Sequence, residues 1–262
     1  MAGRAVLVTG ATGFVGSVVV ERLAQEGVPV RVLVHRADVP SGVGVEGVRG
    51  DLVRSGSVRG LCDGVGVVLH LAARIGGTEE ECRAVNVEGT RALLAEAERA
   101  GVRPHLVYGR GDRWVVPSLV RLLARLPHWV DGGRARMSMV SVDALAGALA
   151  ELAVREEGVR GVLHAGHPEP VTARELVGTV ARELGLPLPR GEVDLSGALE
   201  LLGGPEGPDP VVRRQVSLFA VDHWYDSGRL WGGLAASPGA RFSQAFGQYA
   251  DWYRDQERMR RR

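Results

Sequence analysis

The chain has 262 residues, 45% of them hydrophobic and 24% charged, which suits one large α/β domain or a domain with a smaller lobe and excludes disorder by composition. A formal net charge of +1 gives no overall attraction to nucleic acid or to a membrane surface. Two cysteines without a C-x-x-C pairing argue against a disulfide framework or a zinc site, and the lack of a signal peptide or a membrane-length apolar run predicts a cytoplasmic protein.

The first predicted elements are a strand, a glycine-rich loop and a helix. The valine-rich run AVLVT at 5–9 is typical of a buried strand, and it leads into TGATGFVG and then SVVVERLAQEG. In this order, the glycines are expected to permit a tight turn (Gly10), close approach to a pyrophosphate (Gly13) and close helix packing (Gly16). Free N–H groups at the helix start would hold the phosphates, with a purely structural turn as the alternative. The candidate cofactor-binding residues here are Gly10, Thr12, Gly13, Phe14, Val15 and Gly16.

A second strand is expected over 30–36, about 20 residues beyond the glycine loop, where a ribose-reading residue should fall. The residue there is Arg36, whose guanidinium suits a 2′-phosphate. This favours NADP over NAD. The alternative is a solvated Arg36, with Asp38 reading the ribose.

Further candidate contacts follow at the ends of the next two strands. Asp51 and Leu52 are expected to border an adenine ring, and the small residues of Leu71-Ala72-Ala73 would let a cofactor lie against the backbone. A helix is predicted over 80–101, with Val85, Leu93, Leu94 and Ala97 on its apolar stripe and Gly101 as its C-terminal cap. Asn86, the single asparagine, is expected to bond backbone near the cofactor.

These segments together resemble the extended short-chain dehydrogenase/reductase family, including its NAD(P)-dependent epimerase/dehydratase and 3β-hydroxysteroid dehydrogenase-like branches. The matching pieces are TGATGFVG, GDL at 50–52, HLAA at 70–73, NVEGTRALLAEAERAG at 86–101, RPHLVYGRGDRWVVPSLVRLL and SMVSVDALAGALAELA. The resemblance runs in order over nearly the whole chain. It implies a doubly wound, mostly parallel Rossmann-type sheet with a smaller C-terminal substrate lobe.

The family's catalytic segment is missing. The family places Tyr-x-x-x-Lys on a helix after its fifth strand, and this chain contains no lysine, since all 32 of its basic residues are arginine. Tyr225 has Arg229 at the family's spacing, but arginine substitutes poorly for a compact ammonium. The chain is therefore expected to have one strand–helix unit fewer than the family, with the strand around Leu106 lying beside the strand that ends near Leu71. Tyr108 is the weak catalytic candidate.

Other polar clusters are weaker signals. His164 and His167 flank a glycine at a strand end, with Glu169 nearby. No third metal ligand is evident there, so no metal site is expected. His70 and His105 lie on apolar strands and are interpreted as satisfied core residues. The arginine-rich end of the chain is interpreted as a solvated helix end.

The resulting prediction is a dinucleotide-binding core over 1–113 and an intertwined substrate-side lobe over 114–262. The predicted function of the protein is NAD(P) binding with impaired or absent catalysis. The alternatives are an active oxidoreductase with a non-standard proton donor such as Tyr108, and a cofactor-binding sensor or interaction protein. The expected partners are a nicotinamide dinucleotide and an unidentified small molecule, with no nucleic acid or membrane and with a homodimer left open.

Overall fold

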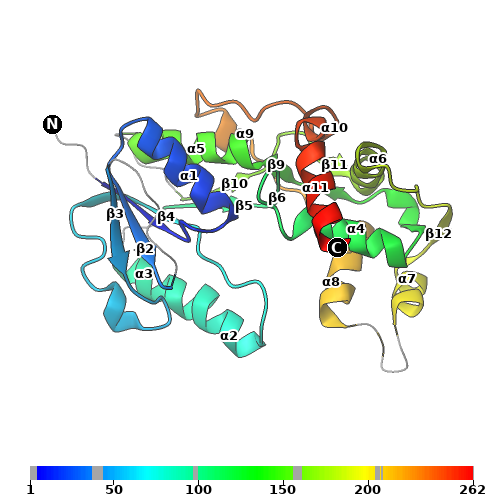
Figure 1. The fold of residues 1–262 in the computed structure, drawn as a ribbon, viewed down its shortest axis with the longest axis horizontal. Coiled ribbons are helices and arrows are strands. Elements are labelled where there is room, and N and C mark those ends of the chain that lie inside the picture. Colours follow the sequence, from blue (N-terminus) through cyan, green and yellow to red (C-terminus); the bar gives the residue numbers. More distant parts are fainter. Residues whose placement is uncertain are drawn as a thin grey trace. The chain divides into compact units, whose positions relative to one another are not determined.

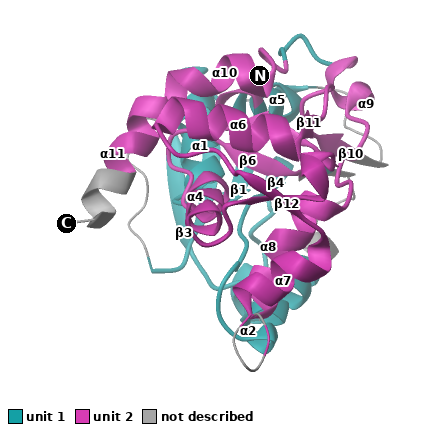
Figure 2. Ribbon diagram, turned by 90° about the vertical axis from the view of Figure 1, so that its right-hand side faces the viewer, with its two compact units in different colours: residues 1–102, 145–162, 234–237 teal, residues 103–144, 163–233, 238–262 magenta. Residues whose placement is uncertain are grey.

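A computed structural model describes residues 5–36, 44–96, 100–155, 161–203, 207 and 209–261. The chain divides into two compact, interleaved units (Figure 2). Unit 1 comprises residues 1–102, 145–162 and 234–237, and unit 2 comprises residues 103–144, 163–233 and 238–262. None of the helices in the described ranges combines the length and the apolar character needed to cross a bilayer.

A four-stranded parallel sheet forms the centre of unit 1. Its strands follow the order β3–β2–β1–β4, and β1 and β2 are almost entirely buried, as expected for valine-rich strands of a parallel sheet. Helix α1 runs along one side of the strands and α3 along the other (Figure 1), which confirms the predicted α/β class. These elements are β1 (Ala5–Thr9), α1 (Phe14–Gln25), β2 (Val30–Val34), β3 (Val45–Arg49) and β4 (Val65–His70).

The helix predicted over 80–101 is confirmed as far as Glu96. It is built from α2 (Glu79–Arg83), a π-helical stretch (Ala84–Gly89) and α3 (Thr90–Glu96). Thr78 and Glu81 form a capping box at its start, and Leu93 is fully buried. Ala97 lies outside the described residues, and for Leu94 only the backbone is described.

The predicted helix cap at Gly101 is wrong. Gly101 lies in the strand β5 (Ala100–Pro104), which pairs with β10 (Gly161–Ala165). Pro104 favours the same extended backbone at Arg103, because proline disfavours helical geometry at the residue before it.

The position expected for the strand around Leu106 is also wrong. This strand, β6 (Leu106–Tyr108), pairs in parallel with β9 (Met139–Ser141). Within the described residues, the ladder of β4 is with β1. Because β5 lies between the helix and β6, two short strands follow the helix instead of one.

Helix α5 (Val142–Val154) contributes most of its length to unit 1, where it is joined by the short segment 234–237. The carboxylate of Glu151 accepts hydrogen bonds from the backbone N–H groups of Ala235 (2.9 Å) and Ala236 (2.7 Å). These bonds hold the Glu151 pKa below its usual value. The segment 234–237 is thereby fastened to α5 within unit 1.

Unit 2 consists of short strand pairs covered by helices. β7 (His128–Val130) pairs in parallel with β12 (Gly191–Val193), and β8 (Arg136–Met137) pairs antiparallel with β11 (Val171–Thr172). A short 3₁₀ turn (Asp131–Gly133) separates β7 from β8, and a second (Phe246–Tyr249) precedes the last helix. The helices are α4 (Val115–Arg125), α6 (Ala173–Leu184), α7 (Leu195–Leu202), α8 (Pro210–Ala220), α9 (Gly228–Trp231), α10 (Phe242–Ala245) and α11 (Ala250–Arg261).

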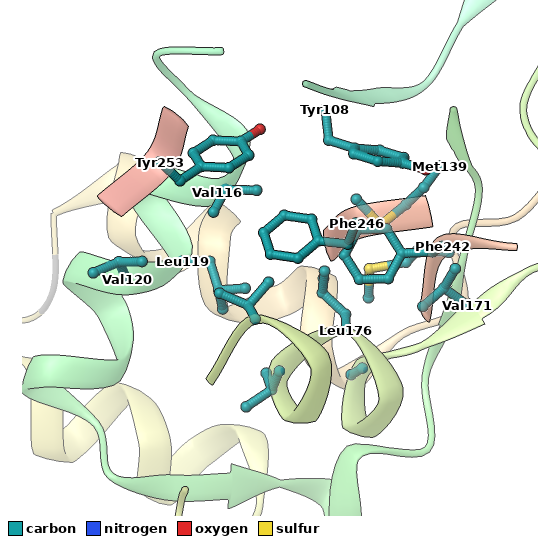
Figure 3. Packing of buried hydrophobic residues seen from close by; sticks show 14 of the residues in the cluster. Tyr108, Val116, Leu119, Val120, Met139, Val171, Leu176, Phe242, Phe246 and Tyr253 are labelled. Atoms are coloured by element: carbon teal, nitrogen blue, oxygen red, sulfur yellow. The ribbon is translucent and has the colours of Figure 1, made fainter. Parts of the chain in front are cut away.

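An aromatic cluster forms the main core of unit 2 (Figure 3). The Tyr108 ring meets Phe242 edge-on with centroids 4.9 Å apart and meets Tyr249 edge-on at 5.7 Å. Phe246 stacks on Tyr253 at 5.4 Å. Edge-to-face and offset contacts of this kind stabilise a core beyond the area that they bury. The C-terminal helices are therefore tied to the strand that carries Tyr108.

Asp112 is the buried acid that organises this region. It is 2% exposed, and its carboxylate accepts hydrogen bonds from the N–H groups of Trp114, Val115 and Val116 at 2.8–2.9 Å. The Tyr253 hydroxyl donates to the same carboxylate (3.0 Å) and accepts from the N–H of Gly109 (2.9 Å). The Asp112 carboxylate thus accepts hydrogen bonds from the first N–H groups of α4 and also links α4 to α11 through Tyr253.

We expect Asp112→Ala to destabilise unit 2 by about 3 kcal/mol, because it leaves several buried donors without an acceptor. Urea denaturation followed by circular dichroism measures this change. The matched control is Asp251→Ala on α11, where the side chain is 94% exposed and a change below about 0.5 kcal/mol is expected. Equal midpoints for the two variants would show that the Asp112 network contributes little.

Candidate functional site

The glycine loop between β1 and α1 is packed too closely for side chains. Gly10 has φ +70°, and a Cβ there would lie 2.6 Å from the backbone nitrogen of Ala72. A Cβ on Gly16 would lie 2.0 Å from the Gly10 carbonyl oxygen. The predicted roles of Gly10 in the turn and Gly16 in helix packing are therefore confirmed by geometry.

The start of α1 is open to an anion. Gly13 is the N-cap residue and provides no side-chain cap, and the first turn contains no acidic residue. Thr12 and Gly13 are exposed, and Phe14 and Val15 are half-buried. The N-terminal N–H groups of this 12-residue helix thus lack a side-chain acceptor, an arrangement that suits a phosphate.

A half-buried histidine, His70, joins the elements that carry the loop. The His70 ring bonds the Thr9 hydroxyl through Nδ1 (2.6 Å) and the Thr90 hydroxyl through Nε2 (2.8 Å). It therefore joins β1, β4 and α3, and burial lowers its pKa below the usual value. The interpretation of His70 as a satisfied core residue is confirmed.

The segment after β4 is held against β1. The Leu71 N–H donates to the Thr9 carbonyl (3.1 Å) and the Ala72 N–H to the Thr9 hydroxyl (3.3 Å). Leu71 and Ala72 are half-buried, whereas Ala73 is exposed. The small side chains of Ala72 and Ala73 leave the backbone approachable at the edge of the sheet where α1 begins.

Asn86 clamps the same segment further along. Its side-chain oxygen accepts from the Arg74 N–H and its side-chain nitrogen donates to the Arg74 carbonyl, both at 2.7 Å. Asn86 lies in the π-helical stretch, a type of irregularity that is frequent at functional sites. The predicted bonding of Asn86 to backbone is confirmed, whereas its place near a cofactor stays a prediction.

Asp51 lies where β3 ends, next to the end of β2. Its Oδ1 accepts from the Val53 N–H (3.0 Å), and its Oδ2 lies 3.4 Å from His35 Nε2 and 3.9 Å from Arg54 Nε. The sequence patterns did not indicate the grouping of His35 and Arg54 around this acid. His35 reaches Asp51 because β2 and β3 pair side by side, whereas Arg54 is only three residues from Asp51 along the chain.

The neighbouring candidates differ in accessibility. Arg36 is exposed, and Asp38 lies outside the described residues. The Leu52 side chain is 8% exposed and packs beneath Gly89, where a Cβ would lie 2.9 Å from that of Leu52. Any contact of Leu52 with an adenine would therefore use mainly its backbone.

Tyr108 is placed unfavourably for proton transfer. The residue is 3% exposed within the aromatic core of unit 2, and burial, followed by the charge of Asp143, raises its pKa to about 12. The nearby Tyr249 hydroxyl donates to Asp143 at 2.5 Å, and its pKa is also raised, mainly by burial. A buried tyrosine with a raised pKa is a poor base at neutral pH.

Tyr225 and Arg229 do not reproduce the helical Tyr-x-x-x-Lys arrangement. Tyr225 precedes α9, and its ring stacks on His105 (4.4 Å between centroids) and His164 (4.7 Å). The two imidazoles are hydrogen-bonded to each other, Nε2 to Nδ1, at 3.0 Å. His105 is thus a bonded, half-buried residue, and its pKa is lowered by burial and then by His164.

The loop at His167 provides no metal centre. The His167 Nδ1 accepts from the Glu169 N–H at 3.1 Å, a local turn contact. Across the described part of the chain, no three His, Cys, Asp or Glu side chains are grouped so that they could hold an ion.

Comparisons with known proteins relate the same residues to a family. Residues 6–115 match the model described as the NAD dependent epimerase/dehydratase family. Sterol demethylase protein B of Methylococcus capsulatus is 44% identical over 103 residues, covering 37% of this chain and 31% of that protein. Ceramide reductase of Caulobacter vibrioides is 42% identical over 106 residues, covering 39% of this chain and 33% of that protein. The chain thus spans about a third of the length of these curated relatives.

Solved structures share the fold over most of the chain. An epimerase from Methanothermobacter thermautotrophicus has a TM-score of 0.69 at 18% identity, covering 99% of this chain and 94% of that chain. UDP-glucose 4-epimerase from Thermus thermophilus, solved in complex with NAD, has a TM-score of 0.65 at 20% identity, covering 95% and 99%. At these identities the likeness establishes the Rossmann-type fold.

Because the pKa values of His70 and His105 are lowered, we expect the free energy of unfolding to depend on pH in the acid range. A histidine whose pKa is lowered on folding stabilises the fold while the pH is above 6.5, the ordinary histidine pKa. This stabilisation is lost as the pH falls. We expect the free energy of unfolding to decrease as the pH falls below 6.5, and the double variant with His70→Gln and His105→Gln to show a shallower decrease. Urea titrations at each pH measure both slopes. Identical slopes would show that neither imidazole is linked to folding.

Proposed function

We propose that the chain binds a nicotinamide dinucleotide in unit 1, because residues 6–115 match the model of the NAD dependent epimerase/dehydratase family. The observation that carries this proposal is the glycine loop, where close packing around Gly10 and Gly16 leaves the uncapped start of α1 facing an accessible turn. Backbone N–H groups at a helix start, together with the positive end of its dipole, bind phosphate without a charged side chain.

The residues present fit such a cofactor along the edge of the sheet. The N–H groups near Gly13 and Val15 would hold the pyrophosphate, and Ala72 and Ala73 would leave room for the cofactor beside the backbone. Asn86 would keep the segment after β4 in place through its two bonds to Arg74. When bound, the nicotinamide supplies hydride transfer, and the protein supplies position and electrostatics.

The cofactor is NADP rather than NAD in this proposal. Arg36 lies two residues beyond the end of β2 and is exposed, and no ion pair engages it within the described residues. A free guanidinium pairs bidentately with a phosphate, whereas it gains little from a ribose hydroxyl.

Catalysis is impaired in the same proposal. The chain contains no lysine to lower the pKa of a tyrosine, and Tyr108 is buried with a raised pKa. Loss of a positioned acid or base costs about 10²–10⁴ in rate. A protein that binds the cofactor without turnover would act as a sensor or an interaction partner. The competing candidate is an active oxidoreductase with a different proton donor. It is supported by the fact that the nicotinamide itself performs the hydride transfer.

For Arg36→Asp, we expect NADPH affinity to fall by about 10–100-fold while NADH affinity hardly changes, because only NADPH carries the phosphate. Isothermal titration calorimetry measures both affinities. The matched control is Arg59→Asp, an exposed arginine elsewhere in unit 1, which should leave both affinities unchanged. An equal loss for the two cofactors would refute the role of Arg36, and a wild type that binds neither would refute the proposed function.

With saturating cofactor, we expect weak or undetectable dehydrogenase turnover on sugar-nucleotide and hydroxysteroid substrates. Steady-state nicotinamide absorbance from neutral to alkaline pH measures it. Turnover of about 1–10³ per second would mean that another residue supplies the proton. Tyr108→Phe then separates the remaining cases, because loss of that activity would assign the proton to Tyr108 and an unchanged rate would exclude it.

A further inference from the structure

Basic side chains from two loops gather around one carboxylate at the end of the sheet. The Asp51 Oδ2 lies 3.4 Å from His35 Nε2 and 3.9 Å from Arg54 Nε. Arg36 follows His35 directly and is exposed. Because β2 and β3 are parallel neighbours, with Val34 opposite Arg49, the two loops leave the sheet at the same edge.

The segment that follows Arg36 cannot add a cation of its own. Residues 37–43 read ADVPSGV and contain no basic residue. A phosphate monoester carries about 1.5–2 negative charges at neutral pH, more than one guanidinium neutralises. A second cation must therefore come from another loop, and the loop after β3 provides Arg54.

The backbone around Arg54 is fixed, whereas its side chain is free to move. The Ser57 N–H donates to the Arg54 carbonyl (2.8 Å), and the Ser57 hydroxyl accepts from the Asp51 N–H (2.8 Å). The Arg54 side chain is 84% exposed, and its 3.9 Å contact with Asp51 is longer than a hydrogen bond. Exposed pairs of this kind contribute about 0–1 kcal/mol, so Arg54 can leave Asp51 at little cost.

We propose that Arg54 is a second phosphate-binding residue, which joins Arg36 on the ribose 2′-phosphate of the cofactor. His35 remains beside Asp51. This inference rests on the proposed function, since it concerns the same cofactor. It adds a residue from a different loop, one to which the glycine-loop pattern does not point.

The test compares ligands that differ only in the 2′-phosphate. Calorimetry with 2′,5′-ADP against 5′-AMP, and with NADP⁺ against NAD⁺, is run on the wild type, Arg54→Ala and the matched control Arg59→Ala. We expect Arg54→Ala to weaken 2′,5′-ADP and NADP⁺ by about tenfold and to leave 5′-AMP and NAD⁺ unchanged, because only the first two ligands carry the phosphate to which Arg54 would donate a charge-assisted bond. Arg59→Ala should bind all four ligands as the wild type does, and circular dichroism verifies the fold of each variant.

The outcomes separate this inference from the proposal beneath it. Equal weakening of phosphorylated and unphosphorylated ligands by Arg54→Ala would overturn the role of Arg54 at the phosphate. So would unchanged NADP⁺ affinity in Arg54→Ala alongside a loss in Arg36→Asp, which would leave the proposed function intact. A wild type that binds none of the four ligands would overturn both.

Discussion

The buried carboxylate of Asp112 is the constraint on which unit 2 depends. Three backbone N–H groups at the start of α4 and the hydroxyl of Tyr253 all donate to it. The Tyr253 hydroxyl accepts in turn from Gly109, so the turn after β6 is bonded on both sides. The same charge helps burial to raise the Tyr253 pKa, which keeps the hydroxyl protonated and able to donate. Helix start, turn and C-terminal helix are therefore one hydrogen-bonded assembly.

Unit 1 depends on contact distance more than on charge. Glycine at positions 10 and 16 lets α1 and the segment after β4 approach within distances that a Cβ would prevent. The His70 bridge between Thr9 and Thr90 then keeps β1, β4 and α3 in register beneath the loop. The proposed phosphate site would require this rigidity, since backbone donors cannot adjust as side chains do.

Local features of unit 1 were predictable from the sequence. The glycine loop combines spacing, a preceding strand and a following helix within about 20 residues, so its conformation depends little on distant segments. Asn86 was also predictable, because a short amide side chain on a helix that faces strand ends has backbone groups within reach. The helix was predicted correctly as far as Glu96.

Features that depend on distant partners were not predictable. The burial of Tyr108 follows from Phe242 and Tyr249, more than a hundred residues further along the chain. The extended backbone at Gly101 follows from the pairing of β5 with β10. The approach of His35 to Asp51 required knowledge of which strand ends are adjacent.

The bonds from Glu151 to the segment 234–237 bear on how this protein can be divided. Unit 1 is discontinuous, made from residues 1–102, residues 145–162 and the four residues 234–237. A fragment cut at residue 102 would lack α5, whose buried residues include Leu145 and Leu149, and would expose the surface that they cover. Unit 1 therefore cannot be isolated by cutting the chain at a single point, because truncation or recombination there would remove some of its segments.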